Sequence, residues 1–162
     1  MNWTGAVRTI FVCAILIVLH YTLRPLLAWR ESIDFMIVAL LLGAVRMRPG
    51  AAAAYGFILG LVADSLGVTV FGAAALGMSV VGFAASWLKA VFFADNLALN
   101  GFFLFVAKWA FDLIFLAAGS MQGSSDLVMQ IFVWSPLAAA VTAVAGVLVL
   151  SVLKPLMEAR TS

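Results

Sequence analysis

One apolar segment of this sequence contains two glycines and a carboxylate at intervals of four residues. Gly56, Gly60 and Asp64 occupy these positions, and every residue between them is apolar. Residues four apart lie on one face of an α-helix. Glycines on that face let a second helix approach closely, and an ionised carboxylate costs about 2.5–3.5 kcal/mol at mid-membrane unless it has a partner. The segment therefore predicts a membrane helix with a close neighbour and a partnered Asp64.

The composition of the whole chain indicates an integral membrane protein. Of its 162 residues, 66% are hydrophobic and 10% are charged, and the mean hydropathy is +1.20. A soluble domain could not bury so many apolar side chains. The net charge is +2 and the basic residues stand singly or in pairs, so no nucleic-acid partner is expected. Cys13 is the single cysteine, and we interpret it as a packing residue.

The apolar runs predict an all-α bundle of about six transmembrane helices. A helix needs about 20 residues to cross a hydrocarbon core of about 30 Å. The predicted spans are residues 9–23, 33–45, 50–66, 72–90, 97–118 and 127–153. The second is short, and a five-span alternative would make it re-entrant between Asp34 and Arg46. Because the connections are short, we expect residues 1–162 to form a single polytopic membrane domain.

The distribution of lysine and arginine predicts the orientation of the chain. With a cytoplasmic N-terminus, the outer loops contain only Arg24 and Arg30, whereas the cytoplasmic segments contain Arg8, Arg46, Arg48, Lys89, Lys154 and Arg160. We therefore expect both termini in the cytoplasm. The first apolar run resembles a signal peptide, but no small-residue cleavage site follows it, which favours a retained helix.

Four polar residues within the predicted spans are expected to form one layer. In this topology His20, Asp64 and Asp112 lie in the outer half of the bilayer and Lys108 lies near its centre. Lys108 and Asp112 are four residues apart, so they can pair along one helix. The expected partner of Asp64 is Lys108, His20 or water in an outer cavity. The layer is interpreted either as a lock between helices or as a ligand or proton site.

A second small-residue stripe follows the predicted fourth helix. At intervals of three and four residues it contains Gly72, Ala75, Ser79, Gly82 and Ser86. Such a stripe supports close helix packing. Packing against the predicted third helix is the favoured interpretation, and a seam between two copies in a homodimer is the alternative. In the last helix, Pro136 predicts a mild kink near the outer end.

The sequence contains no pattern typical of an enzyme. Catalysis would require a nucleophile beside a base, paired carboxylates with access to water, or a metal cluster. The spacing of Asp64, Lys108 and Asp112 requires none of these, and no second His or Cys stands at ligand spacing from His20. We predict a protein without enzymatic activity, metal or cofactor.

Residues 56–76 resemble the signature of the rod-shape-determining protein MreD family. The matching residues are Gly56-Phe57-x-x-Gly60-Leu61-x-x-Asp64 and Gly72-x-x-Ala75-Leu76. The resemblance implies a non-catalytic subunit of the bacterial inner (cytoplasmic) membrane that maintains cell shape within the cell-elongation machinery and helps organise peptidoglycan synthesis. It implies direct binding to MreC, and weaker or indirect contacts with RodA, its transpeptidase and MreB.

The resemblance also implies a fold similar to the substrate-binding subunits of energy-coupling-factor vitamin transporters. Those subunits hold a ligand in an outward-facing cavity. In the alternative function, this chain is a small-molecule-binding transporter subunit, and the polar layer contacts a polar ligand or a membrane lipid. The short loops and the few further outer polar residues favour the assembly role, in which Gly56, Gly60 and Asp64 build the core.

Overall fold

The computed structural model describes residues 11–22, 33–66, 71–89, 96–119 and 128–158, of which residues 152–158 are described by their backbone alone. The regular elements in these ranges are all helical. They are the first helix Phe11–Thr22, α2 Phe35–Ala44, α3 Pro49–Leu66, α4 Ala73–Trp87, α6 Leu97–Gly119, the π-helical turn η1 Gln130–Trp134 and α8 Ser135–Glu158.

Each predicted span contains a helix at the expected place, and the all-helical prediction is confirmed for the described residues. Three helical stretches are long and apolar enough to cross a membrane, namely Pro49–Leu66, Leu97–Ala118 and Gln130–Ser151. The first helix, α2 and α4 are shorter apolar helices. A crossing by all six therefore stays a prediction.

Helix α2 forms the centre of the bundle, and all ten of its residues are buried. At 1.5 Å per residue it is about 15 Å long, which is half of a hydrocarbon core of about 30 Å. Its start is fixed by Asp34, whose Oδ1 accepts hydrogen bonds from the backbone N–H groups of Met36 and Ile37. Its end is fixed by a tight turn, in which the N–H of Met47 donates to the carbonyl of Ala44 before Pro49 begins α3.

Two neighbouring helices contact the middle of α2 through one carbonyl. Cys13 Sγ of the first helix lies 3.5 Å from the Ala39 oxygen, and the Tyr55 hydroxyl of α3 donates to the same oxygen at 3.3 Å. Cys13 is buried, in agreement with its interpretation as a packing residue. The Tyr55 ring fills the space beside Gly43, where an added Cβ would lie 2.6 Å from the ring.

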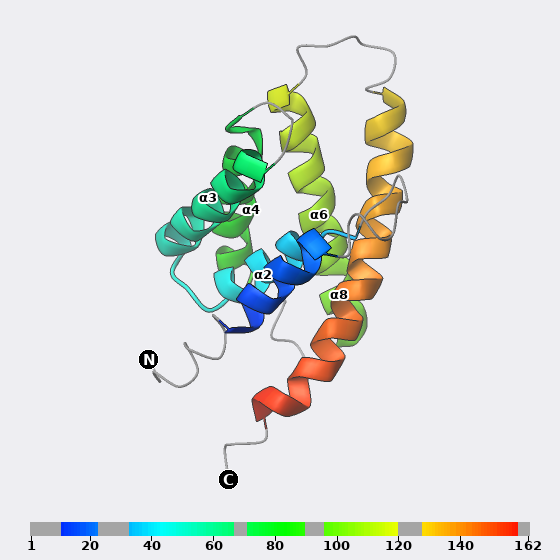
Figure 1. Ribbon diagram of the computed structural model, residues 1–162. Helices are drawn as coiled ribbons and strands as arrows, with labels where there is room; N and C mark the ends of the chain where they lie inside the picture. The colour runs from blue at the N-terminus through cyan, green and yellow to red at the C-terminus, as the bar shows by residue number, and fades with distance from the viewer. Residues whose placement is uncertain (1–10, 23–32, 67–70, 90–95, 120–127, 159–162) are drawn as a thin grey trace.

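Helices α3 and α4 make the most extensive helix pair and lie side by side on one flank of the bundle (Figure 1). A Cβ added at Gly56 would overlap the carbonyl of Met78, and one added at Gly60 would overlap the backbone of α4 at Ala74 and Ala75. The two backbones therefore touch, which explains why both positions are glycine. The expected packing of α4 against the preceding helix is confirmed.

The four further members of the α4 stripe have distinct environments. An added Cβ at Gly82 would lie 2.6 Å from the Ala52 oxygen, and one at Gly56 would lie 3.1 Å from Ser79 Cα. Ser86 is buried and donates to the Met47 carbonyl at 2.7 Å. Gly72 is not a packing residue, because an added Cβ would contact nothing there. Instead it precedes α4 with a positive φ of 97°, a conformation that glycine adopts without strain.

Helices α6 and α8 form the opposite flank of the bundle (Figure 1), and α6 also packs against α4. The two flanks and α2 share one apolar core. Members of this core from successive helices are Leu16, Leu40, Leu59, Met78, Leu104 and Ala143.

The last helical segment contains a π-helical turn directly before Pro136, where the sequence predicted a mild kink. In this turn the N–H of Ser135 donates to the carbonyl of Gln130, five residues earlier. The next bond of that pattern would need an N–H at residue 136, and proline has none. The carbonyl of Ile131 accepts instead from the indole Nε1 of Trp109, at 3.4 Å. The irregular turn is thereby joined to α6.

Candidate functional site

Buried and partly buried polar side chains from four helices meet at the start of α2, around Asp34. Its Oδ2 lies 3.2 Å from Lys108 Nζ of α6, and its Oδ1 lies 3.7 Å from His20 Nδ1 of the first helix. Its backbone N–H donates to the Thr142 hydroxyl of α8 at 3.2 Å. One residue therefore caps α2 and joins it to three other helices.

Lys108 lies between two carboxylates. Its Nζ contacts Asp112 Oδ1 at 2.6 Å as well as Asp34 at 3.2 Å, and it stands 5.1 Å from the centre of the Phe111 ring. The predicted pair of Lys108 and Asp112 is thus confirmed. Lys108 is buried and both carboxylates are partly buried. Removing one partner of a fully buried pair costs about 3–5 kcal/mol, whereas the intact pair contributes little net stability.

Asp64 has different partners from those that the sequence predicted. Its Oδ2 accepts from the N–H groups of Gly72 at 2.9 Å and Ala75 at 3.0 Å, and its Oδ1 accepts from Ala74 at 3.1 Å. The expected pairing of Asp64 with Lys108 or His20 was wrong, because backbone N–H groups bind both carboxylate oxygens. The chain returns from α3 so that α4 begins beside Asp64, and the unsatisfied N–H groups of that helix end bind the carboxylate.

The predicted polar layer thus separates into two arrangements. We call His20, Asp34, Lys108 and Asp112 the Asp34 cluster, and Asp64 is a cap on α4. Sequence reasoning placed Asp34 only at the end of a helix and missed its central role. The signal was available, because an aspartate directly before an apolar run is a typical N-cap. Nothing in the sequence singled out Thr142, a buried hydroxyl in a long apolar run.

The Asp34 cluster can hold helices together and can exchange protons. It contains two carboxylates, one ammonium group and one imidazole, linked in the order His20, Asp34, Lys108, Asp112. Within the described ranges, no three His, Cys, Asp or Glu side chains are grouped so that they could hold a metal ion. The chemistry that the cluster supports is charge pairing and proton binding.

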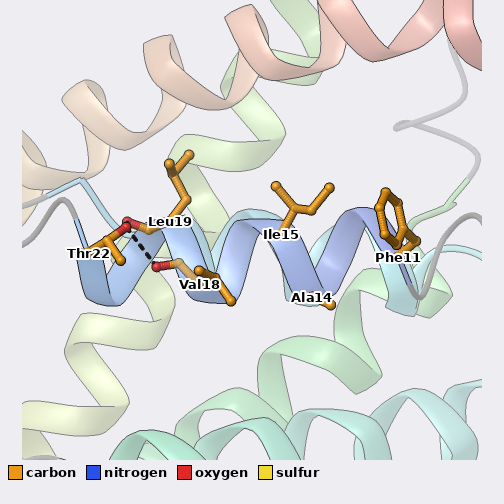
Figure 2. Close-up of a pocket in the computed structure, with 6 residues that line it drawn as sticks. All are labelled: Phe11, Ala14, Ile15, Val18, Leu19 and Thr22. Carbon is orange, nitrogen blue, oxygen red and sulfur yellow. Dashed lines mark hydrogen bonds between the residues drawn. The ribbon is translucent and has the colours of Figure 1, made fainter.

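An apolar groove of about 280 Å³ runs along the first helix, and none of its lining residues belongs to the Asp34 cluster. Figure 2 shows its lining: Phe11, Ala14, Ile15, Val18, Leu19 and Thr22. The Thr22 hydroxyl donates to the carbonyl of Val18 at 2.9 Å, the bond drawn in the figure. The groove therefore suits hydrocarbon or apolar side chains better than a hydrophilic ligand.

A bundle of apolar helices, joined internally by a buried ion-pair cluster, defines this chain as a helical membrane protein. Residues 4–159 match the family described as rod shape-determining protein MreD. The match covers nearly the whole chain, so the chain belongs to this family. Family membership supports a role in rod shape determination. No curated protein and no solved structure matches the chain. The expected likeness to energy-coupling-factor subunits therefore stays a prediction.

Proposed function

We propose that this chain is a non-catalytic inner-membrane subunit of the bacterial cell-elongation machinery, which binds MreC directly and helps organise peptidoglycan synthesis. Membership of the MreD family carries the proposal, because the match extends over residues 4–159. RodA, its transpeptidase and MreB are the expected indirect or weaker partners. The six-span topology with both termini in the cytoplasm is part of the same proposal.

The internal geometry supports an assembly role. Asp34 and Asp64 bind helix N-termini within the chain, and Lys108 is held between two carboxylates. These groups are therefore used in fixing the bundle. The alternative, a small-molecule-binding subunit of a vitamin or substrate transporter, would require them to contact a ligand instead.

Affinity purification of the tagged full chain from its native membrane in mild detergent tests the proposal. Mass spectrometry should identify MreC together with wall-synthesis enzymes. We expect Gly60→Leu to reduce MreC recovery, because a side chain there displaces α4, and Gly50→Leu to preserve it, because an added Cβ at Gly50 contacts nothing. Size-exclusion chromatography and circular dichroism establish whether each variant is folded.

Two outcomes would contradict the proposal. The first is a folded parent chain that recovers no MreC, even after chemical crosslinking in the membrane. The second is recovery of an ATPase-coupled module or of a stoichiometric small molecule, which would make the chain a transport subunit. As a functional complement, depletion of the chain should produce rounded cells, and its re-expression should restore rods.

A further inference from the structure

The Asp34 cluster has an alternating order of side chains. Lys108 contacts a carboxylate on each side, Asp34 at 3.2 Å and Asp112 at 2.6 Å. His20 lies at the far side of Asp34, with 3.7 Å between Nδ1 and Oδ1. Along this chain of contacts a group that can be positive always stands next to a group that can be negative. The arrangement is fully alternating only if His20 carries a proton on both ring nitrogens.

Counting charges identifies a missing positive charge. Two carboxylates face one ammonium group, so the cluster has one excess negative charge when His20 is neutral. His20 and Lys108 are each 7% exposed, and the side chains of Asp34 and Asp112 are each 14% exposed. An uncompensated charge at such depth is costly, and the usual response is a change of protonation.

Several described groups that contact the cluster are neutral. Tyr21, beside His20, donates its hydroxyl to Met36 Sδ. On α8, the Thr142 hydroxyl accepts from the backbone N–H of Asp34 at 3.2 Å. The carboxylate of Asp64 has its own three backbone donors on α4. Among the side chains of the Asp34 cluster, His20 is therefore the one placed to supply the missing charge.

We propose that the Asp34 cluster is a proton-binding site whose proton resides on His20 as an imidazolium. The bound proton makes the four side chains electroneutral and attracts the first helix to α2. Loss of the proton leaves the Asp34 carboxylate beside a neutral ring and weakens that attraction. The attachment of the first helix to the bundle therefore depends on proton binding.

The chain contains a single histidine, so its charge state can be measured without assignment. The full chain, labelled with ¹⁵N-histidine and placed in lipid nanodiscs, is studied by nitrogen NMR at pH 7. An imidazolium gives two protonated ring nitrogens with similar shifts, whereas a neutral ring gives one protonated and one bare nitrogen with well-separated shifts. We expect the imidazolium form in the parent chain.

Two variants and one control make the test specific. Asp34→Asn removes the carboxylate nearest the ring, and Asp112→Asn removes a charge whose direct partner is Lys108. In either variant, one carboxylate and Lys108 remain, so the cluster is neutral when His20 is neutral. The ratio of charged to neutral imidazole should therefore fall at least about tenfold, which corresponds to one pKa unit. Asp64→Asn makes the same chemical change at the α4 cap and should leave the ratio unchanged.

A neutral His20 in the folded parent chain at pH 7 would overturn the proposal and place the missing proton on a carboxylate. A charged His20 that persists in Asp112→Asn would also overturn it, because charge balance would then not control the site. If Asp34→Asn does not fold, Asp112→Asn decides, since it leaves the cap of α2 intact.

Discussion

At the scale of single residues, Gly60 and Gly72 are glycines for different physical reasons. Gly60 is required by space, because an added Cβ would overlap the backbone of Ala74 and Ala75. Gly72 is required by conformation, because its φ is 97° although an added Cβ would contact nothing. A left-handed backbone costs other residues about 1–2 kcal/mol. Both glycines serve the start of α4, one from α3 and one from the turn.

Gly60→Ala should lower the free energy of unfolding by about 1–3 kcal/mol, because it forces the backbones of α3 and α4 apart. Gly50→Ala is a matched control in the same helix, since an added Cβ there meets nothing. That control should be neutral or stabilising by up to about 1 kcal/mol. Unfolding in mixed detergent, followed by circular dichroism, measures both. Equal effects of the two substitutions would contradict the close approach at Gly60.

Asp64→Ala should destabilise the bundle by about 1–2 kcal/mol, because it removes the side-chain acceptor from the N-terminus of α4. Asp64→Asn keeps one acceptor oxygen and should lose less. Ser65→Ala provides the control, because the exposed Ser65 hydroxyl bonds only the nearby Val62 carbonyl. The same unfolding assay applies. A cap role is excluded if Asp64→Ala is as stable as the control.

At the scale of elements, irregular backbone occurs where another helix can satisfy it. The π-helical turn before Pro136 leaves the Ile131 carbonyl without its regular backbone donor, and Trp109 of α6 donates to it at 3.4 Å. The start of α4 follows the same logic, since its N–H groups bind a carboxylate of α3. Because lipid offers no hydrogen bonds, such inter-helix contacts decide where a membrane helix can be irregular.

A double-mutant cycle tests the contact between Trp109 and Ile131. Trp109→Phe should cost about 1–3 kcal/mol, because it leaves the partly buried Ile131 carbonyl without a donor. Pro136→Ala restores a backbone N–H that can bond Ile131, so Trp109→Phe should cost less in that background. The coupling should be about 0.5–1.5 kcal/mol in the detergent unfolding assay. Additive effects of the two substitutions would show that Trp109 does not compensate for the proline.

At the scale of the whole molecule, the bundle is organised around its shortest labelled α-helix. All residues of α2 are buried, and α3, α4, α6 and α8 all contact it. Asp34 joins the first turn of α2 to Lys108. In the turn after α2, the Met47 carbonyl accepts a hydrogen bond from Ser86. At about 15 Å, α2 is half as long as a hydrocarbon core of about 30 Å is thick. Longer helices cover α2, which accounts for the absence of polar side chains within it.

Reporter fusions test the predicted topology. Six spans with a cytoplasmic N-terminus place the C-terminus in the cytoplasm, where a fused green fluorescent protein should fluoresce. Alkaline phosphatase inserted within residues 67–70 should be active, and within residues 90–95 it should be inactive. A re-entrant second segment would leave five spans and place the two termini on opposite sides of the membrane. That alternative would be supported if the C-terminal green fluorescent protein fusion did not fluoresce and a C-terminal alkaline phosphatase fusion were active.

The sequence by itself determined the features that depend on local geometry. Apolar composition required membrane helices, and their positions followed from charged and turn residues. The pair of Lys108 and Asp112 was predictable, because residues four apart are neighbours on any helix. The glycines at 56 and 60 indicated a close neighbouring helix for the same reason. The family resemblance rested on residues within one short segment.

Only the tertiary structure decided which distant groups meet. The sequence contains Asp34, His20 and Lys108 in separate helices, and their contact depends on how three helices pack. Asp64 was expected to pair with Lys108, His20 or water. Backbone N–H groups bind it, because the start of α4 lies beside the end of α3. Local periodicity fixes the face on which a residue lies. Packing among helices fixes what that face contacts.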